Sequence, residues 1–221
     1  IQMTVAWSHS ALKDYENCAR KYHEVRVLKK FPFDKTEQIL YGESLHKAAE
    51  DYVRGSALPE AFKYMQPIID SLMAKEGKNS VEIKMALDAS LQPCDWFDKK
   101  VWVRGIADFL SLDFENKKAW IVDYKTGSNK YPDTDQLELM ALLTFAHYPD
   151  IDKVNAALLF VVKESITKLT VRREDAEKLW WKYRERVAKI ESSHSSGVWN
   201  PKQSGLCKWC AVTSCEFNPK H

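Results

Sequence analysis

The chain has 221 residues, of which 45% are hydrophobic and 29% are charged, and its formal net charge at pH 7 is +2. At roughly 150 residues per domain, this length predicts one domain with a core of ordinary size. No segment approaches the roughly 18 consecutive apolar residues of a membrane helix, and the residues before Ser8 lack the layout of a signal peptide. The composition argues against a membrane protein and predicts a cytoplasmic one, whether cellular or virus-encoded.

The first third of the chain predicts helices. Ser8 and Ser10 are candidate N-caps for a helix in which apolar or aromatic side chains recur at helical spacing. These positions are Leu12, Tyr15, Ala19, Tyr22 and Val25. After a turn over residues 31–34, further helices are expected over residues 36–53 and 59–75.

The rest of the chain alternates strands with helices. Apolar, β-prone segments predict strands over residues 81–87, 101–113, 119–124, 154–162 and 165–171. A helix is expected from Asp133 or Thr134 to His147, and another over residues 174–192. This order predicts an α/β fold with a central mixed sheet flanked by helices.

Two of the expected strands carry acidic residues that could act together. Asp108 follows Gly105-Ile106-Ala107, and Asp123 and Lys125 lie at the end of an apolar segment. Because a strand alternates faces, Asp123 and Lys125 point the same way. Two carboxylates can bind Mg²⁺ or Mn²⁺, which activates water for attack on a phosphodiester, and Glu82 is a further acidic candidate. Asp-x-Lys alone is a weak motif that is usually part of a solvated surface.

The cysteines suggest a metal site. There are five, an odd number, which argues against a disulfide framework. Cys207, Cys210 and Cys215 lie within nine residues of one another, and a closed tetrahedral site or a cuboidal cluster needs a fourth thiolate. The spacing leaves Cys18 and Cys94 both open as the fourth ligand.

The ordered set of motifs resembles the PD-(D/E)XK nuclease superfamily in its RecB-like branch. Asp108 matches the first acidic position, Asp123-Tyr124-Lys125 the (D/E)-x-K element, and Gln136 the glutamine motif. The segment Gly42-Glu43-Ser44-Leu45-His46 fits the pattern Gly-x-x-x-His of this branch. The chain departs from the family at Met140, where the glutamine motif commonly has a tyrosine.

The resemblance implies a restriction-endonuclease-like core and assigns roles to these residues. The catalytic residues would be Asp108, Asp123, Lys125 and Gln136. The ligands of Mg²⁺ or Mn²⁺ would be His46, Asp108, Asp123 and the backbone carbonyl of Tyr124. Glu50, one turn after His46, would either orient that histidine or belong to the surface.

RecB-like nucleases of the AddB type, and the CRISPR-associated exonucleases similar to them, carry a 4Fe–4S cluster. The resemblance selects Cys18 with Cys207, Cys210 and Cys215 as the cluster ligands and leaves Cys94 as a spare thiol. The cluster would join the N-terminal helices to the C-terminal cysteine-rich tail. Zinc at the same four cysteines is the alternative.

The function implied by the resemblance is a divalent-metal-dependent DNA exonuclease. It would act on the ends of single-stranded DNA in recombination, repair or CRISPR adaptation. The alternatives are a structure-specific endonuclease of the same fold and a DNA-binding assembly subunit that does not cleave. Because the sequence has no phosphate-binding loop motif, a helicase or a recombination or adaptation protein would be a separate partner. The sequence leaves the oligomeric state open, with a homo-oligomer as one alternative.

One nuclease domain is expected over residues 1–221. It would consist of a helical part (1–79), a catalytic core (80–172) and a C-terminal helix with the cysteine cluster (173–221). Four aromatic residues are either base-stacking candidates or members of the core. They are Tyr41, Trp96, Trp102 and Tyr131.

Overall fold

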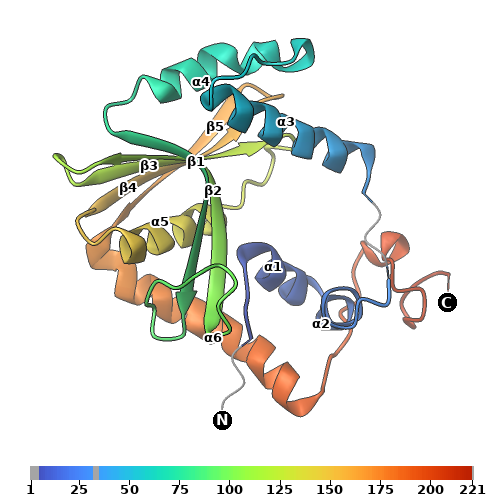
Figure 1. Cartoon of the computed structure of the whole chain (residues 1–221). Coiled ribbons are helices and arrows are strands. Elements are labelled where there is room, and N and C mark those ends of the chain that lie inside the picture. The colour runs from blue at the N-terminus through green and yellow to red at the C-terminus, as the bar shows by residue number, and fades with distance from the viewer. Residues whose placement is uncertain (1–4, 32–34, 221) are drawn as a thin grey trace. The chain divides into compact units, whose positions relative to one another are not determined.

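The computed structural model describes residues 5–31 and 35–220 (Figure 1). Its contacts divide the chain into two compact units, one spanning residues 35–180 and the other combining residues 1–34 with 181–221. Residues 32–34 of the expected turn lie outside the described residues. Within the described ranges, no helix has the length and apolar character needed to cross a bilayer.

The larger unit is built on a sheet of five strands in the order β1-β2-β3-β4-β5. The strands are β1 (Lys78–Asp88), β2 (Val101–Asp113), β3 (Lys118–Lys125), β4 (Lys153–Phe160) and β5 (Ser165–Arg172). Neighbouring strands are antiparallel except β3 and β4, which are parallel and joined through helix α5 (Asp135–His147). The predicted mixed sheet flanked by helices is confirmed.

One face of the sheet is covered by α3 (Glu37–Val53), the 3₁₀ helix η2 (Glu60–Met65) and α4 (Gln66–Met73) (Figure 1). The sequence predicted one continuous helix over residues 59–75, whereas residues 60–65 form the tighter 3₁₀ turns of η2. The side chains buried in this layer include Leu45, Phe62, Met65, Ile69, Phe109 and Val122. Their packing holds α3 against the sheet.

Helix α5 covers the opposite face, and eight of its thirteen side chains are buried. It lies close to β2 at Gly105, where an added Cβ would be 2.6 Å from Leu143 Cδ1 and 2.7 Å from Met140 Sδ. Met140, which occupies the position where the family commonly has tyrosine, is therefore a core residue packed against β2.

The smaller unit begins with α1 (His9–Asn17), whose first turn is capped by Ser8 Oγ accepting from the Ala11 N–H at 3.3 Å. The helix expected to continue through Val25 is interrupted at Cys18, where the backbone is extended (φ −166°, ψ 111°). Cys18 ends α1 and also caps α2 (Ala19–Tyr22), since its Sγ accepts from the Lys21 N–H at 3.5 Å. The interruption leaves the thiol at a helix junction.

The C-terminal part of this unit packs against α1. A short 3₁₀ turn, η3 (Arg173–Asp175), leads into α6 (Ala176–Ser196), which contributes to this unit from Trp181 onward. Arg186 binds Glu16 through Nε at 2.6 Å and through Nη2 at 2.9 Å. The tail then forms the 3₁₀ turn η4 (Cys207–Trp209), while α2 continues into the π-helical turn η1 (His23–Val27).

Candidate active site

The register of the sheet brings three carboxylates into one row across β1, β2 and β3. The β1–β2 ladder pairs Val81 with Phe109 and Ile83 with Ala107, so Glu82 and Asp108 lie between these pairs, opposite each other. The last pair of the β2–β3 ladder is Phe109 with Val122, and the next positions along these strands are Asp108 and Asp123. Carboxylates separated by 26 and 15 residues in the sequence therefore become cross-strand neighbours.

β2 and β3 separate just beyond this row. Asp108 Oδ2 accepts a hydrogen bond from the Tyr124 backbone N–H at 2.8 Å, so a side chain takes the place of a backbone carbonyl in the ladder. The residues of β2 before Asp108 pair with β1 and not with β3. The carboxylates thus lie where β2 and β3 separate. At this opening they are accessible to side chains from the helices on both faces of the sheet.

The backbone at Glu82 is unusual. Its φ is +51°, in the left-handed region, although the residue lies inside a strand and is not glycine. Such a conformation costs on the order of 1–3 kcal/mol and is concentrated at functional sites, because surrounding structure must enforce it. The neighbouring β1–β2 pairs on both sides enforce it here.

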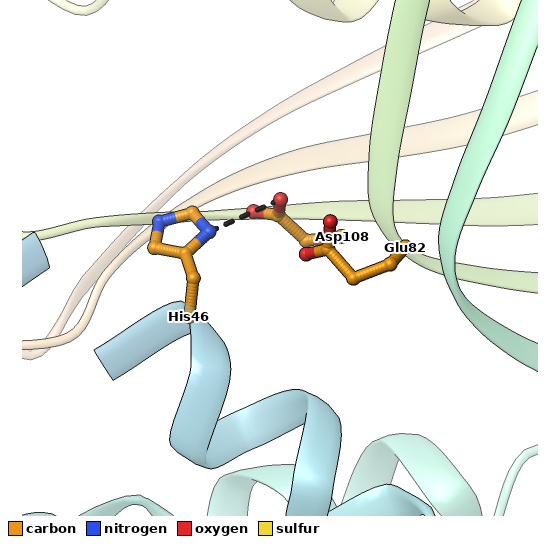
Figure 2. Close-up of side chains that lie close together, drawn as sticks. All are labelled: His46, Glu82 and Asp108. Atoms are coloured by element: carbon orange, nitrogen blue, oxygen red, sulfur yellow. Dashed lines mark ion pairs between the residues drawn. The ribbon is translucent and has the colours of Figure 1, made fainter. Parts of the chain in front are cut away.

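His46 completes a cluster with two of the carboxylates (Figure 2). It reaches from α3 so that its Nδ1 lies 3.1 Å from Asp108 Oδ1. Its ring meets the Tyr124 ring edge-on, with centroids 5.9 Å apart. One ligand atom each from His46, Glu82 and Asp108 lies within 4.8 Å of the other two.

This donor set fits a divalent cation. A histidine nitrogen and a carboxylate oxygen at 3.1 Å both carry lone pairs, so a proton or a cation must lie between them. Ligands of an octahedral ion at about 2.1 Å lie roughly 3–4 Å apart, so a small closure of the cluster would suffice. One imidazole with two or three carboxylates suits Mg²⁺ or Mn²⁺ better than a thiophilic metal.

Asp123, Lys125 and Gln136 form a closed ring of contacts beside the cluster. Lys125 Nζ donates to Gln136 Oε1 at 2.7 Å and lies 2.7 Å from Asp123 Oδ2. Gln136 Nε2 donates to the other Asp123 oxygen. Gln136 belongs to the first turn of α5, so the helix head positions both charged groups.

Burial and charge shift the pKa values of these groups. Burial, followed by the charge of Asp108, raises the pKa of Asp123 to about 6, although Lys125 opposes the shift. Burial and the charges of Asp108 and Glu50 raise the pKa of Glu82. Burial alone would lower the pKa of His46, but the hydrogen bond and charge of Asp108 reverse the direction and raise it. A cation would relieve this accumulation of negative charge.

Two further predicted residues, Tyr124 and Glu50, lie near the cluster. Tyr124 contacts the site through its backbone N–H and its ring, and its carbonyl stays a predicted ligand. Glu50 lies on α3 with Arg54 Nη2 at 2.8 Å from its Oε1 and Lys47 Nζ at 3.4 Å from its Oε2. These ion pairs favour a surface role for Glu50.

The structure separates the four aromatic candidates. Trp102 is 3% exposed and packs near Trp180 in the core. Trp96 is half-buried with Lys84 and Arg104 over its ring. The other two, Tyr41 and Tyr131, are 39% and 82% exposed.

Cys18, Cys207, Cys210 and Cys215 line one cavity of about 70 Å³ in the smaller unit. Arg20, Lys21 and Lys202 line it as well, and the Lys202 N–H donates to Cys18 Sγ at 3.5 Å. Among the described cysteines, no three sulfurs come within 4.8 Å of one another. Cys94 lies in the larger unit and does not line this cavity.

A mixed sheet that presents a histidine, carboxylates and a lysine at one opening is suited to the hydrolysis of phosphodiesters. The chain matches the model of the PD-(D/E)XK nuclease superfamily over residues 6–87 and 69–215, and it belongs to that superfamily. It is therefore a nuclease, and its substrate is a nucleic acid. No curated protein matches the chain in sequence.

The fold also resembles that of solved proteins. A candidate exonuclease from Eubacterium rectale aligns with a TM-score of 0.53 at 15% identity, over 92% of this chain and 86% of that one. The protein SSO0001 aligns with a TM-score of 0.42 at 14% identity, over 98% of this chain and 87% of the other. The first likeness supports the restriction-endonuclease-like fold.

Proposed function

We propose that this nuclease is a divalent-metal-dependent DNA exonuclease of the RecB-like branch that hydrolyses single-stranded DNA from its ends. The observation that carries the metal-dependent chemistry is the convergence of His46 with Glu82 and Asp108 at the opening between β2 and β3. The likeness in fold to a candidate exonuclease supports action at ends. The proposed process is recombination, repair or CRISPR adaptation, and the proposed location is the cytoplasm. A separate helicase would unwind the DNA.

The proposed ligands of Mg²⁺ or Mn²⁺ are His46, Glu82, Asp108, Asp123 and the carbonyl of Tyr124. A bound ion of this kind lowers the pKa of water and stabilises charge on the phosphate. Asp123 is a proposed ligand because it neighbours Asp108 across β2 and β3. To bind the ion, its carboxylate would have to loosen its contacts with Lys125 and Gln136. Glu82 thus extends the set that the sequence motif supplies.

Lys125 is the proposed electrostatic catalyst. Its ammonium group, partly exposed and held 2.7 Å from both Gln136 Oε1 and Asp123 Oδ2, can turn to a phosphate oxygen without a change in the backbone. A positive charge placed at the phosphate stabilises the extra negative charge of the transition state. Gln136 acts as a positioning residue, since it holds both Lys125 and Asp123.

We further propose a 4Fe–4S cluster at Cys18, Cys207, Cys210 and Cys215. All four cysteines line one cavity of the smaller unit, although Cys18 is far from the other three in the sequence. The basic side chains of Arg20, Lys21 and Lys202 around the cavity complement the negative charge of four thiolates.

The proposed activity is tested with end-labelled DNA and Mg²⁺ or Mn²⁺. The wild-type protein should degrade linear single strands, and Asp123→Ala should lower the rate by at least ~10³-fold, as expected for loss of a group that acts with the metal. EDTA should abolish degradation. A pure protein that cleaves no DNA with either ion would be a binding subunit, and the proposal would fail.

Closed circular single-stranded DNA separates the two modes of cleavage. An exonuclease leaves the circle intact while it degrades the same strand after linearisation. Cleavage of the circle at a comparable rate would instead identify a structure-specific endonuclease of the same fold. Labels at the 5′ or the 3′ end of the linear strand report the direction of digestion.

A further inference from the structure

Two exposed tyrosines form a fixed pair on the larger unit. Tyr41 lies on the second turn of α3 and Tyr64 on η2, and they are 39% and 44% exposed. Their hydroxyl oxygens are 2.9 Å apart in a hydrogen bond. The Tyr41 ring also packs on the buried Phe62, with centroids 5.5 Å apart and planes tilted by 54°. The two rings are therefore held in place while part of each faces solvent.

Tyr41 lies on the helix that also carries His46 of the candidate active site. A Cβ added at Gly42 would be 3.3 Å from Thr126 Oγ1, and Thr126 directly follows Lys125. His46 is one turn beyond Gly42 on the same helix. At 1.5 Å and 100° per residue, Tyr41 is about 7.5 Å from His46 along the axis of α3 and about 140° around it.

We propose that the Tyr41–Tyr64 pair binds an unpaired base of single-stranded DNA a few nucleotides from the phosphate that is cleaved. This inference rests on the proposed DNA nuclease function and names the residues that give it a preference for single strands. About 7.5 Å corresponds to roughly two nucleotides at the ~3.4 Å rise of a stacked strand. Because the pair also lies around the helix from His46, a base on it would be at least about two nucleotides from the phosphate that reaches the metal ligands.

The chemistry of the pair matches an unpaired base. Tyrosine rings stack on the flat face of any base, which gives binding without sequence preference. In a duplex those faces are covered by neighbouring base pairs, so only unpaired bases can use the rings.

The test measures binding of the full chain to a thymidine oligonucleotide that contains one 2-aminopurine, in EDTA so that no cleavage occurs. Stacking on tyrosine quenches 2-aminopurine fluorescence. Tyr41→Leu and Tyr64→Leu should each weaken binding roughly tenfold and remove the quenching. Tyr41→Phe keeps the ring and loses only the hydroxyl contact, so it should retain the quenching and bind within about threefold of wild type.

Phe114→Leu is the matched control, because Phe114 is 48% exposed and lies at the β2–β3 turn. At about 3.3 Å per residue it is roughly 20 Å from Asp108 along β2, so its removal should change neither readout. Unfolding curves establish that each variant is folded.

Unchanged binding and quenching in a folded Tyr41→Leu/Tyr64→Leu variant would overturn the inference, even if the protein degrades DNA. Equal loss of duplex and single-strand binding in that variant would also overturn it, as would a wild-type chain that binds no oligonucleotide. Tyrosine-dependent quenching in a protein without nuclease activity would support the binding site while the proposed function fails.

Discussion

The Asp123 carboxyl is almost completely buried beside a second carboxylate, which raises its pKa to about 6. The same group in the unfolded chain titrates near 3.8. The folded protein therefore holds the proton more tightly, and folding becomes less favourable as the pH rises from about 4 to about 6. Above that range the protein keeps an ionised carboxylate at a cost in stability.

Because ionised Asp123 lowers the stability of the folded protein, the substitution Asp123→Asn should raise it when EDTA keeps the protein free of metal. The neutral amide avoids the cost, so the variant should be more stable than wild type at pH 8, by up to about 3 kcal/mol in the free energy of unfolding. The gain should shrink as the pH falls through 6 and disappear near pH 4. Urea unfolding at several pH values measures it, and a gain that grows on acidification would contradict the assignment of the raised pKa.

Glu82 combines a strained backbone with a side chain that belongs to the cluster of His46 and Asp108. This combination supports the proposal that its carboxylate binds the metal ion. We expect Glu82→Gln to weaken Mn²⁺ binding at least ~10-fold, since an amide is a poorer ligand than a carboxylate. Titration calorimetry of the metal-free protein measures the affinity.

The matched control is Glu50→Gln, which removes a nearby carboxylate whose contacts are Lys47 and Arg54. Its effect on Mn²⁺ affinity should stay within about threefold, the size expected from a charge near the site. Equal effects of the two substitutions would show that Glu82 contributes only charge and does not bind the ion.

Among the elements, the start of β1 controls where Glu82 falls. Gly77 precedes this strand with φ +128°, and an added Cβ would lie 2.6 Å from the carbonyl oxygen of Leu112 on β2. Only glycine allows this close approach, which begins the ladder at Lys78 with Leu112. The register that follows places Glu82 opposite Asp108.

We predict that Gly77→Ala destabilises the protein by about 2–4 kcal/mol, from the strained φ together with the clash against backbone. Gly55→Ala is the control: φ there is +106°, but an added Cβ has nothing within 4 Å. It should cost only about 1 kcal/mol. Thermal or urea unfolding compares the two, and equal costs would mean that the contact with Leu112 relaxes freely.

At the scale of the whole molecule, the smaller unit joins the two ends of the chain. Its N-terminal and C-terminal parts meet through Arg186 with Glu16 and through the Tyr15 hydroxyl, which donates to the Lys189 carbonyl at 2.9 Å. Cys18 and Cys207 are 189 residues apart, yet they line the same cavity. A group bound by both would close a very long loop, which favours the folded chain through the entropy of the unfolded one.

Cys18→Ser should therefore lose bound iron and lower the unfolding temperature of the smaller unit more than that of the larger one. Iron and sulfide analysis with differential scanning calorimetry measures both effects. Cys94→Ser is the control, because Cys94 is a cysteine of the larger unit outside the cavity, and it should keep the iron of wild type. Stoichiometric zinc without iron in the purified wild-type protein would contradict the cluster.

Much of this protein could be predicted from its sequence, because strands, helices and short motifs depend on local patterns. The alternation of apolar residues indicates the five strands and their order with the helices, and the Asp-x-Lys element with Asp108 indicates the superfamily. The break of the first helix at Cys18 was not predicted, since its neighbours keep helical spacing on both sides.

Only the tertiary structure decided which side chains meet. The sequence offered Glu82 only as a further acidic candidate, and the β1–β2 register together with α3 brought it into one cluster with Asp108 and His46. The Tyr41–Tyr64 pair likewise depends on the packing of η2 against α3. Contacts of this kind join residues far apart in the chain and are set by register and packing, so no local pattern in the sequence encodes them.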